Sequence, residues 1–250
     1  MIRLDSISKT LSKGSPNETK IFRELNLDIL KNDFIILVGS NGSGKSTLLN
    51  LLAGTMFPDN GKIFFDENDV TRIRDYKRSK WIARIFQNPN AGTAPELSIL
   101  ENFRLASLRT KSKGLSIGTG DKFKSHVREK VSFLNLGLEN KLNMVMGNLS
   151  GGQRQALTLL MAIMDETKLL LLDEPIAALD PPTSELILKL ASKVIQDYDL
   201  TAVLVTHQIK DVIGFGNRVI QLKEGQIIRD FKKNAEHELN MKDIYEWFGE

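Results

Sequence analysis

The chain has 250 residues, of which 41% are hydrophobic and 26% are charged. These are ordinary globular values, so they exclude disorder, collagen and coiled coil as descriptions of the whole chain. Lys and Arg exceed Asp and Glu by 34 − 31 = 3, a balance too mild to indicate nucleic-acid binding, and we expect none. Cysteine is absent, which excludes disulfides and thiolate chemistry and fits a reducing compartment.

Membrane-spanning helices need about 20 apolar residues, and the best run, Ala156 to Met164, is interrupted by Thr158. The first residues carry no signal-peptide core. We therefore expect a cytosolic protein whose only connection to a membrane is a partner.

The first predicted elements are strands. Residues 2–7 alternate apolar and polar, and residues 21–30 alternate in part, which together predict an antiparallel edge sheet. Residues 34–38 are apolar without alternation, which is typical of a strand buried on both faces of a parallel sheet.

Two further buried strands are predicted downstream. Residues 169–172 run into Asp173, and residues 202–205 run into Thr206 and His207. Helical patterns lie at residues 46–52, 153–164 and 183–197. The alternation of strand and helix predicts an α/β fold with a doubly wound sheet.

The middle of the chain differs from both ends. Between residues 89 and 154 there is no convincing buried strand, while residues 98–108 and 122–136 have helical patterns. We predict a helical subdomain over 89–154, inserted into a core formed by 1–88 and 155–250. A basic loop at 110–124 has no evident role, and we interpret its charge as a solvated face.

A glycine-rich segment follows the strand at 34–38 and leads into an apolar helix. It reads Gly39, Ser40, Asn41, Gly42, Ser43, Gly44, Lys45, Ser46, Thr47, which fits the phosphate-loop pattern in the context that the pattern requires. Glycines let backbone N–H groups point at phosphate oxygens, and the helix N-terminus adds partial positive charge. We expect Lys45 to reach the β- and γ-phosphates of ATP and Ser46 to bind Mg²⁺.

Two acidic residues end the strand at 169–172. Asp173 is placed to hold Mg²⁺ through water, and Glu174 to polarise the attacking water as a base.

A third motif resembles a known family. Leu149, Ser150, Gly151, Gly152 and Gln153 precede a helix and are similar to the signature of ATP-binding cassette (ABC) ATPases. Further matches in the family order are Gln87 (the Q-loop glutamine), residues 178–180 (the D-loop) and His207 (the switch histidine). The resemblance covers nearly the whole chain and implies a P-loop ATPase core with an antiparallel edge sheet and an inserted helical subdomain.

The resemblance also implies roles. Gln87 would meet Mg²⁺ and report ATP occupancy, and His207 would hydrogen-bond the γ-phosphate and position Glu174 and the water. Ser150 is a good helix N-cap. In the resembled family the segment Ser150 to Gln153 completes the ATP site of the opposite subunit, so two chains sandwich two ATPs head to tail.

One feature departs from the family pattern. The aromatic residue that usually stacks on adenine is missing, and Leu11 stands at its position. Leu11 could pack on the base, and Phe22 is a second, weaker candidate.

Residues 87–100 resemble the surface on which a transporter ATPase receives its permease. The resemblance extends to bacterial importers that include proposed aromatic amino acid systems. It implies an ATPase peripheral to the inner face of the membrane, with a substrate-binding protein as an indirect partner that, with the permease, selects the solute. A soluble repair ATPase is disfavoured, because the stretch between Gln87 and Leu149 cannot hold long coiled coils. A translation factor is disfavoured because it would carry two such units. A scaffold ATPase for iron–sulfur assembly or division remains an alternative.

Overall fold

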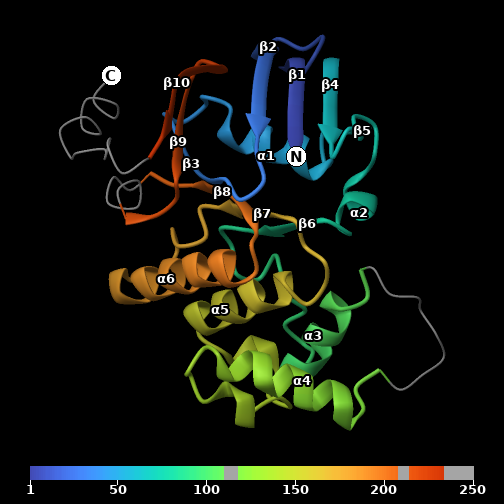
Figure 1. The fold of residues 1–250 in the computed structure, drawn as a ribbon, viewed down its shortest axis with the longest axis vertical. Helices are drawn as coiled ribbons and strands as arrows, with labels where there is room; N and C mark the ends of the chain where they lie inside the picture. The colour runs from blue at the N-terminus through green and yellow to red at the C-terminus, as the bar shows by residue number, and fades with distance from the viewer. Residues whose placement is uncertain (110–117, 208–213, 234–250) are drawn as a thin grey trace. The chain divides into compact units, whose positions relative to one another are not determined.

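The structure is a computed structural model that describes residues 1–109, 118–207 and 214–233 (Figure 1). Residues 110–117 of the predicted basic loop therefore lie outside the described residues. The chain forms two compact units, Met1–Arg78 with Asp199–Glu250, and Ser79–Tyr198. The predicted boundaries at 89 and 154 divide the chain differently and stay a prediction.

The first unit contains the predicted antiparallel sheet. Its strand order is β2-β1-β4-β5, with every neighbouring pair antiparallel. The strands are β1 (Ile2–Leu11), β2 (Thr19–Ile29), β4 (Asn60–Phe65) and β5 (Asn68–Asp69). In β1, Leu4 and Ile7 are both buried although three positions separate them. A register shift between them, with Ser6 at φ 51°, restores the inward face, as a bulge does.

The first unit also holds the buried parallel strands. Here β3 (Phe34–Val38) lies between β8 (Thr201–Val205) and β9 (Arg218–Lys223) and is parallel to both. All residues of β3 and β8 are buried, as their unbroken apolar runs predict. The last strand, β10 (Gln226–Lys232), is antiparallel to β9. The α/β fold with an antiparallel edge sheet is confirmed.

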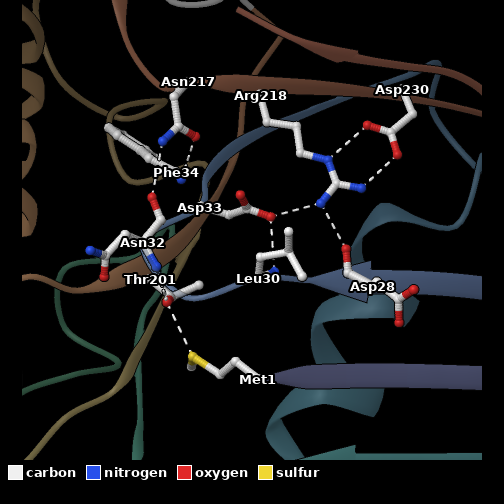
Figure 2. Close-up of polar contacts among 10 residues, drawn as sticks. All are labelled: Met1, Asp28, Leu30, Asn32, Asp33, Phe34, Thr201, Asn217, Arg218 and Asp230. Atoms are coloured by element: carbon white, nitrogen blue, oxygen red, sulfur yellow. Dashed lines mark hydrogen bonds and ion pairs between the residues drawn. The ribbon is translucent and has the colours of Figure 1, made fainter.

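A buried arginine ties these strands together (Figure 2). The guanidinium of Arg218 donates to both carboxylate oxygens of Asp230, at 2.7 and 2.6 Å, to Asp33 Oδ2 at 2.7 Å and to the carbonyl of Asp28 at 2.7 Å. The hydrogen bond to Asp230 is the main cause that raises the pKa of Arg218, against its partial burial. The cluster links β2, β9 and β10 to Asp33, the residue before β3, and so fixes the amino end of β3.

Two more side chains hold the start of β3 (Figure 2). Asn217 accepts the N–H of Phe34 at 2.8 Å and donates to the carbonyl of Asn32 at 2.9 Å. Thr201 Oγ1 accepts the N–H of Asn32 at 3.0 Å. Because one end of β3 is fixed in this way, strand geometry sets the position of its other end, where Gly39 follows.

The helix after β3 is α1 (Lys45–Ala53), and its C-terminal end is held by Arg78, the last residue of the short helix α2 (Asp75–Arg78). Arg78 is 1% exposed and donates to the carbonyls of Leu51 and Leu52, both at 2.7 Å. Burial lowers the pKa of Arg78 to about 10. This side chain supplies donors that the last carbonyls of a helix otherwise lack.

The second unit pairs β6 (Ile82–Ile85) in parallel with β7 (Leu169–Asp173). Its helices are α3 (Ile99–Ala106), α4 (Asp121–Ser132), α5 (Gly151–Ala162) and α6 (Pro181–Asp197), with 3-10 turns at Leu138–Asn140 and Met146–Asn148. These helices match the four predicted in this part of the chain to within a few residues. Among the described residues, no helix is both long and apolar enough to cross a membrane.

Candidate functional site

The phosphate loop lies in the first unit and is closely packed. A Cβ at Gly39 would stand 2.2 Å from the carbonyl oxygen of Leu222, and one at Gly44 would stand 2.8 Å from the ring of Phe22. Both residues have positive φ, 152° and 109°. These positions therefore require glycine for space as well as for backbone conformation.

The helix that follows the loop has no side-chain cap. Gly44 is the N-cap of α1 and makes no side-chain hydrogen bond, whereas α3, α5 and α6 are capped by Ser98, Ser150 and Asp180. Ser43 Oγ is buried and has no hydrogen-bond partner among the described residues. An uncapped helix N-terminus beside an unsatisfied hydroxyl fits an anion with several acceptor oxygens, such as a phosphate group.

Lys45 supplies the charge. It is 6% exposed, and its Nζ donates to the carbonyls of Gly39 at 2.8 Å and Ser40 at 2.9 Å. The ammonium thus lies across the loop that it follows in sequence. Charge-assisted bonds to phosphate oxygens are stronger than bonds to neutral carbonyls, so a bound phosphate competes for this side chain. The neighbouring Ser46 is exposed and Thr47 is buried.

His207 follows the strand next to the phosphate loop. Leu37 of β3 is paired with Val205 of β8, so Gly39 and His207 both come two residues beyond that pair. The carboxyl ends of parallel strands meet at one edge of a sheet, and the structure therefore brings the exposed His207 to the edge that carries the loop. This placement was predicted, while the role of His207 stays a prediction.

The two candidates for contact with the base differ. Leu11, the last residue of β1, is partly exposed. Phe22 is 0% exposed and its ring packs where a Cβ of Gly44 would be. The suggestion that Phe22 could stack on adenine is wrong, because this ring supports the phosphate loop from the protein interior.

In the second unit, Asp173 ends β7 and Glu174 begins the following turn. Glu174 has φ 47°, a left-handed conformation that costs about 1–2 kcal/mol for a residue with a Cβ. Its carbonyl accepts the N–H of Ala177 at 3.2 Å. Asp173 Oδ2 accepts from Arg84 Nη2 of β6 at 2.6 Å, a contact that the sequence analysis missed.

The signature segment begins α5 as predicted. Ser150 Oγ accepts the N–H of Gln153 at 3.2 Å, and Gln153 Oε1 accepts the N–H of Ser150 at 3.1 Å, which is a complete capping box. The cap therefore engages the third N–H of the helix, and Gly151 and Gly152 precede it.

The structure adds a packing reason for one signature glycine. A Cβ at Gly152 would be 2.3 Å from Thr183 Cγ2, near the start of α6. Thr183 in turn donates its N–H to Asp180, the N-cap of α6 and the last D-loop residue, at 3.1 Å. The hydrogen bond from the Thr183 side chain lowers the pKa of Asp180. The signature and the D-loop are thus packed together within this unit.

Gln87 is exposed and follows a residue that is tied to the signature helix. The carbonyl of Phe86 accepts from Gln155 Nε2 at 3.1 Å, and Gln155 is 1% exposed. Arg154 of the same helix hydrogen-bonds Asn90. The segment after Gln87 therefore rests on α5.

The predicted permease surface needs a correction at its end. Ile99 is 0% exposed and Leu100 is 7% exposed, since Ser98 caps α3 and turns both side chains into the core. Neither residue is available to a partner, so substituting Ile99 would test stability and not coupling. The exposed residues of the segment are Gln87, Asn88, Asn90, Ala91, Gly92 and Glu96, with Leu97 partly exposed.

Asn102 was not anticipated and holds this surface in shape. It is 3% exposed; its Oδ1 accepts the N–H of Ala94 at 2.8 Å, and its Nδ2 donates to the carbonyls of Ala94 and Ser98, both at 3.0 Å. An asparagine four residues after the capping serine Ser98 was the available signal.

Taken together, a glycine-rich loop between a buried parallel strand and a helix, a lysine across that loop, and a strand-end carboxylate define a P-loop nucleoside triphosphatase. Residues 22–177 match the family described as ABC transporter. The chain therefore belongs to the ABC transporter family, as a nucleotide-binding domain that binds and hydrolyses ATP.

Named relatives agree with this assignment. The chain is 36% identical over 252 residues to the tyrosine transport ATP-binding protein of Clostridioides difficile (strain R20291), covering 99% of this chain and 98% of that one. It is 32% identical to the macrolide export ATP-binding/permease protein MacB of Campylobacter fetus, of which it spans 37%. A dimeric structure of the ATP-binding cassette MJ0796 bound to ADP and Pi matches with a TM-score of 0.77 and 31% identity, covering 93% of this chain and 98% of that one.

Proposed function

We propose that this chain is the ATPase subunit of an importer for a small solute, such as an amino acid, and works on a separate permease at the inner face of the cell membrane. The relative that it matches over nearly its whole length is named for tyrosine transport. In the exporter relative, the matching region is about a third of a longer ATP-binding/permease chain. The tyrosine transport relative, 98% of which is covered, is itself named as an ATP-binding protein, and we propose a substrate-binding protein as the indirect partner.

The observation that carries the ATP-binding proposal is Lys45 lying across a loop whose helix has no side-chain cap. In this proposal the N–H groups from Gly39 to Thr47 and the Lys45 ammonium bind the phosphates. Leu11 packs on the base. His207, at the same sheet edge, donates to the terminal phosphate.

The catalytic roles are proposed for residues of both units. Ser46, Gln87 and Asp173 would hold Mg²⁺, which when bound neutralises charge on the phosphates. Hard oxygen donors, with one carboxylate, suit an ion that binds mostly through substrate phosphates and water. Glu174 would accept the proton of the attacking water, a role worth about 10²–10⁴ in rate.

The signature segment would serve a second copy of the chain. Ser150 is exposed and begins a helix whose N-terminus is a suitable anion site. We propose that Ser150, Gly151, Gly152 and Gln153 complete the ATP site of the partner copy in a head-to-tail homodimer. The similar cassette MJ0796 was solved as a dimer.

Mixing two inactive variants tests this arrangement. Lys45→Ala should lose ATP binding and hydrolysis, and Ser150→Arg should lose hydrolysis because a bulky cation blocks the facing phosphate. In a mixed dimer, one site carries both defects and the other carries none, so independent sites recover activity on mixing. Lys31→Ala, an exposed lysine of the same unit, is the control. Full activity of Ser150→Arg alone would refute the shared site.

The Glu174→Gln variant gives a second readout. It should bind ATP without turnover and accumulate as a dimer in ATP and Mg²⁺, which size-exclusion chromatography with light scattering measures.

Co-purification with a multi-spanning permease then separates a transporter subunit from a scaffold ATPase. Recovery of a soluble assembly complex instead would overturn the importer proposal.

A further inference from the structure

Arg84 is the one charged residue of β6, a strand whose other members, Ile82, Ala83 and Ile85, are buried. Its partner in the parallel register is Leu171 of β7, two residues before Asp173. The long side chain reaches along the neighbouring strand to the carboxylate at its end. The result is a hydrogen-bonded ion pair of 2.6 Å between Arg84 Nη2 and Asp173 Oδ2.

This pair is shielded from solvent. The exposed fractions of the two side chains are 13% for Arg84 and 18% for Asp173. Solvent screens partly buried charges less than surface charges, and a charged hydrogen bond of this length is strong. The guanidinium also lies over the ring of Phe86, with Cζ 4.9 Å from the ring centroid. Asp173 therefore has a resident cation supplied by its own unit.

We propose that Arg84 is a positioning residue that shares Asp173 with the catalytic metal and thereby sets how much Mg²⁺ the protein needs to bind ATP. This inference rests on the proposed function, in which Asp173 holds Mg²⁺. The arginine occupies Oδ2, so it fixes the carboxylate plane and leaves Oδ1 for the metal or its water. Its positive charge opposes a divalent cation at the same carboxylate.

The sign of the effect follows from charge. Removing Arg84's charge strengthens the attraction of Asp173 for Mg²⁺, so half-saturation by Mg²⁺ should occur at a lower concentration. Energetic coupling between two sites in a protein typically changes affinity by about fivefold or more, and we expect a shift at the low end of that range. A merely structural arginine would change stability and leave the Mg²⁺ requirement as it is.

The experiment titrates Mg²⁺ into the full-length protein with a fluorescent non-hydrolysable ATP analogue and follows the analogue's binding. Arg84→Met should lower the Mg²⁺ half-saturation about fivefold, and Arg84→Lys, which keeps the charge, should stay near wild type. Arg128→Met changes an exposed arginine of the same unit and should have no effect. Arg84→Gln replaces Arg84→Met if the latter fails to fold, as judged by circular dichroism. An unchanged or raised half-saturation in the neutral variants overturns the proposal.

Asp173→Asn separates this inference from the proposed function. If Asp173→Asn leaves the Mg²⁺ dependence unchanged, the metal role of Asp173 fails and the inference fails with it. If Asp173→Asn raises the Mg²⁺ concentration at half-saturation but neutralising Arg84 leaves that concentration unchanged, only the inference fails. In the Asp173→Asn background, Arg84→Met should have lost most of its effect, because the shared carboxylate is gone.

Discussion

The close packing of Gly152 against Thr183 predicts what one added methyl group would do in the signature segment. In Gly152→Ala, the new Cβ would meet Thr183 Cγ2 at 2.3 Å, whereas ordinary contact is 3.4–4 Å. Either the Thr183 side chain must therefore leave its present rotamer, or the start of α5 must move away from the start of α6 by more than 1 Å. Overpacking of this kind costs about 1–3 kcal/mol, and the better helix propensity of alanine offsets at most about 1 kcal/mol of it.

The magnitude can be checked by thermal unfolding. For a chain of this size, 1 kcal/mol changes Tm by about 2–4 °C, so a net cost of about 1–2 kcal/mol should lower Tm by about 2–8 °C. Thr183→Ser removes the offending methyl and keeps the hydroxyl and the N–H that pair with Asp180. The double variant Gly152→Ala/Thr183→Ser should therefore recover most of the lost stability.

Gly151→Ala is the matched control for stability. Its Cβ would stand 3.4 Å from Leu179 Cδ2, at the near limit of ordinary contact, so Tm should change little. Equal losses at Gly151 and Gly152, or no rescue of Gly152→Ala by Thr183→Ser, would refute the packing explanation. The requirement for glycine at both positions would then come from backbone conformation or from the bound nucleotide.

Three further outcomes are expected. Arg218→Met leaves the buried Asp33 without its cation and should lower the free energy of unfolding, measured in urea, by about 3–5 kcal/mol. Arg23→Met, on the exposed face of β2, should be neutral. Equal effects of the two substitutions would contradict the role of the cluster. The Thr10 N–H lowers the pKa of Asp59 below its ordinary value of 3.8. The ionised Asp59 therefore contributes its full stabilisation above that pH, and the stabilisation is lost as pH falls through the lower pKa of the folded state. In Asp59→Asn, Tm should fall less steeply with pH in acid than in the wild type. Leu97→Asp should keep the native circular dichroism spectrum and the basal ATPase activity but lose stimulation by reconstituted permease. Stimulation equal to that of the wild type would show that Leu97 is not part of the coupling surface.

Some strands could be predicted because their own residues are sufficient evidence of burial, without knowledge of any contact elsewhere in the chain. The buried strands β3, β7 and β8 are unbroken apolar runs, and this pattern alone indicates burial on both faces. The phosphate loop is equally local, because its glycines, lysine and helix follow one another in the sequence.

Among the described residues, the strands that were not predicted are β4, β5, β6, β9 and β10, and two of these, β6 and β9, have charged or amide side chains directed into the protein. Arg84 interrupts β6, and Arg218 and Gln221 interrupt β9. Each arginine is acceptable inside the protein because a distant carboxylate pairs with it, Asp173 for Arg84 and Asp33 for Arg218. A hydropathy pattern along one segment cannot reveal a partner 89 or 185 residues away, so both strands look like loops in the sequence.

The error at Ile99 had a local remedy. Ser98 and Glu101 have the spacing of a capping box, which marks the start of a helix and places Ile99 and Leu100 in its first turn. The hydrogen bonds of Ser98 to Glu101 also lower the pKa of that carboxyl group. The helix predicted at 98–108 and its cap therefore conflict with a partner surface that extends to residue 100, and the exposed segment ends before Ile99.

The two helix N-termini assigned to ATP are constructed in opposite ways, and the difference bears on their roles. The N-cap of α1 is Gly44, which offers no side chain, and Lys45 supplies a charge within the same loop. The N-cap of α5 is Ser150, whose hydroxyl already satisfies Gln153. An uncapped terminus with its own cation has most to gain from a phosphate, whereas a capped terminus is stable without one. This contrast supports the proposal that α1 binds the nucleotide within one chain and that α5 contacts the nucleotide held by a second copy.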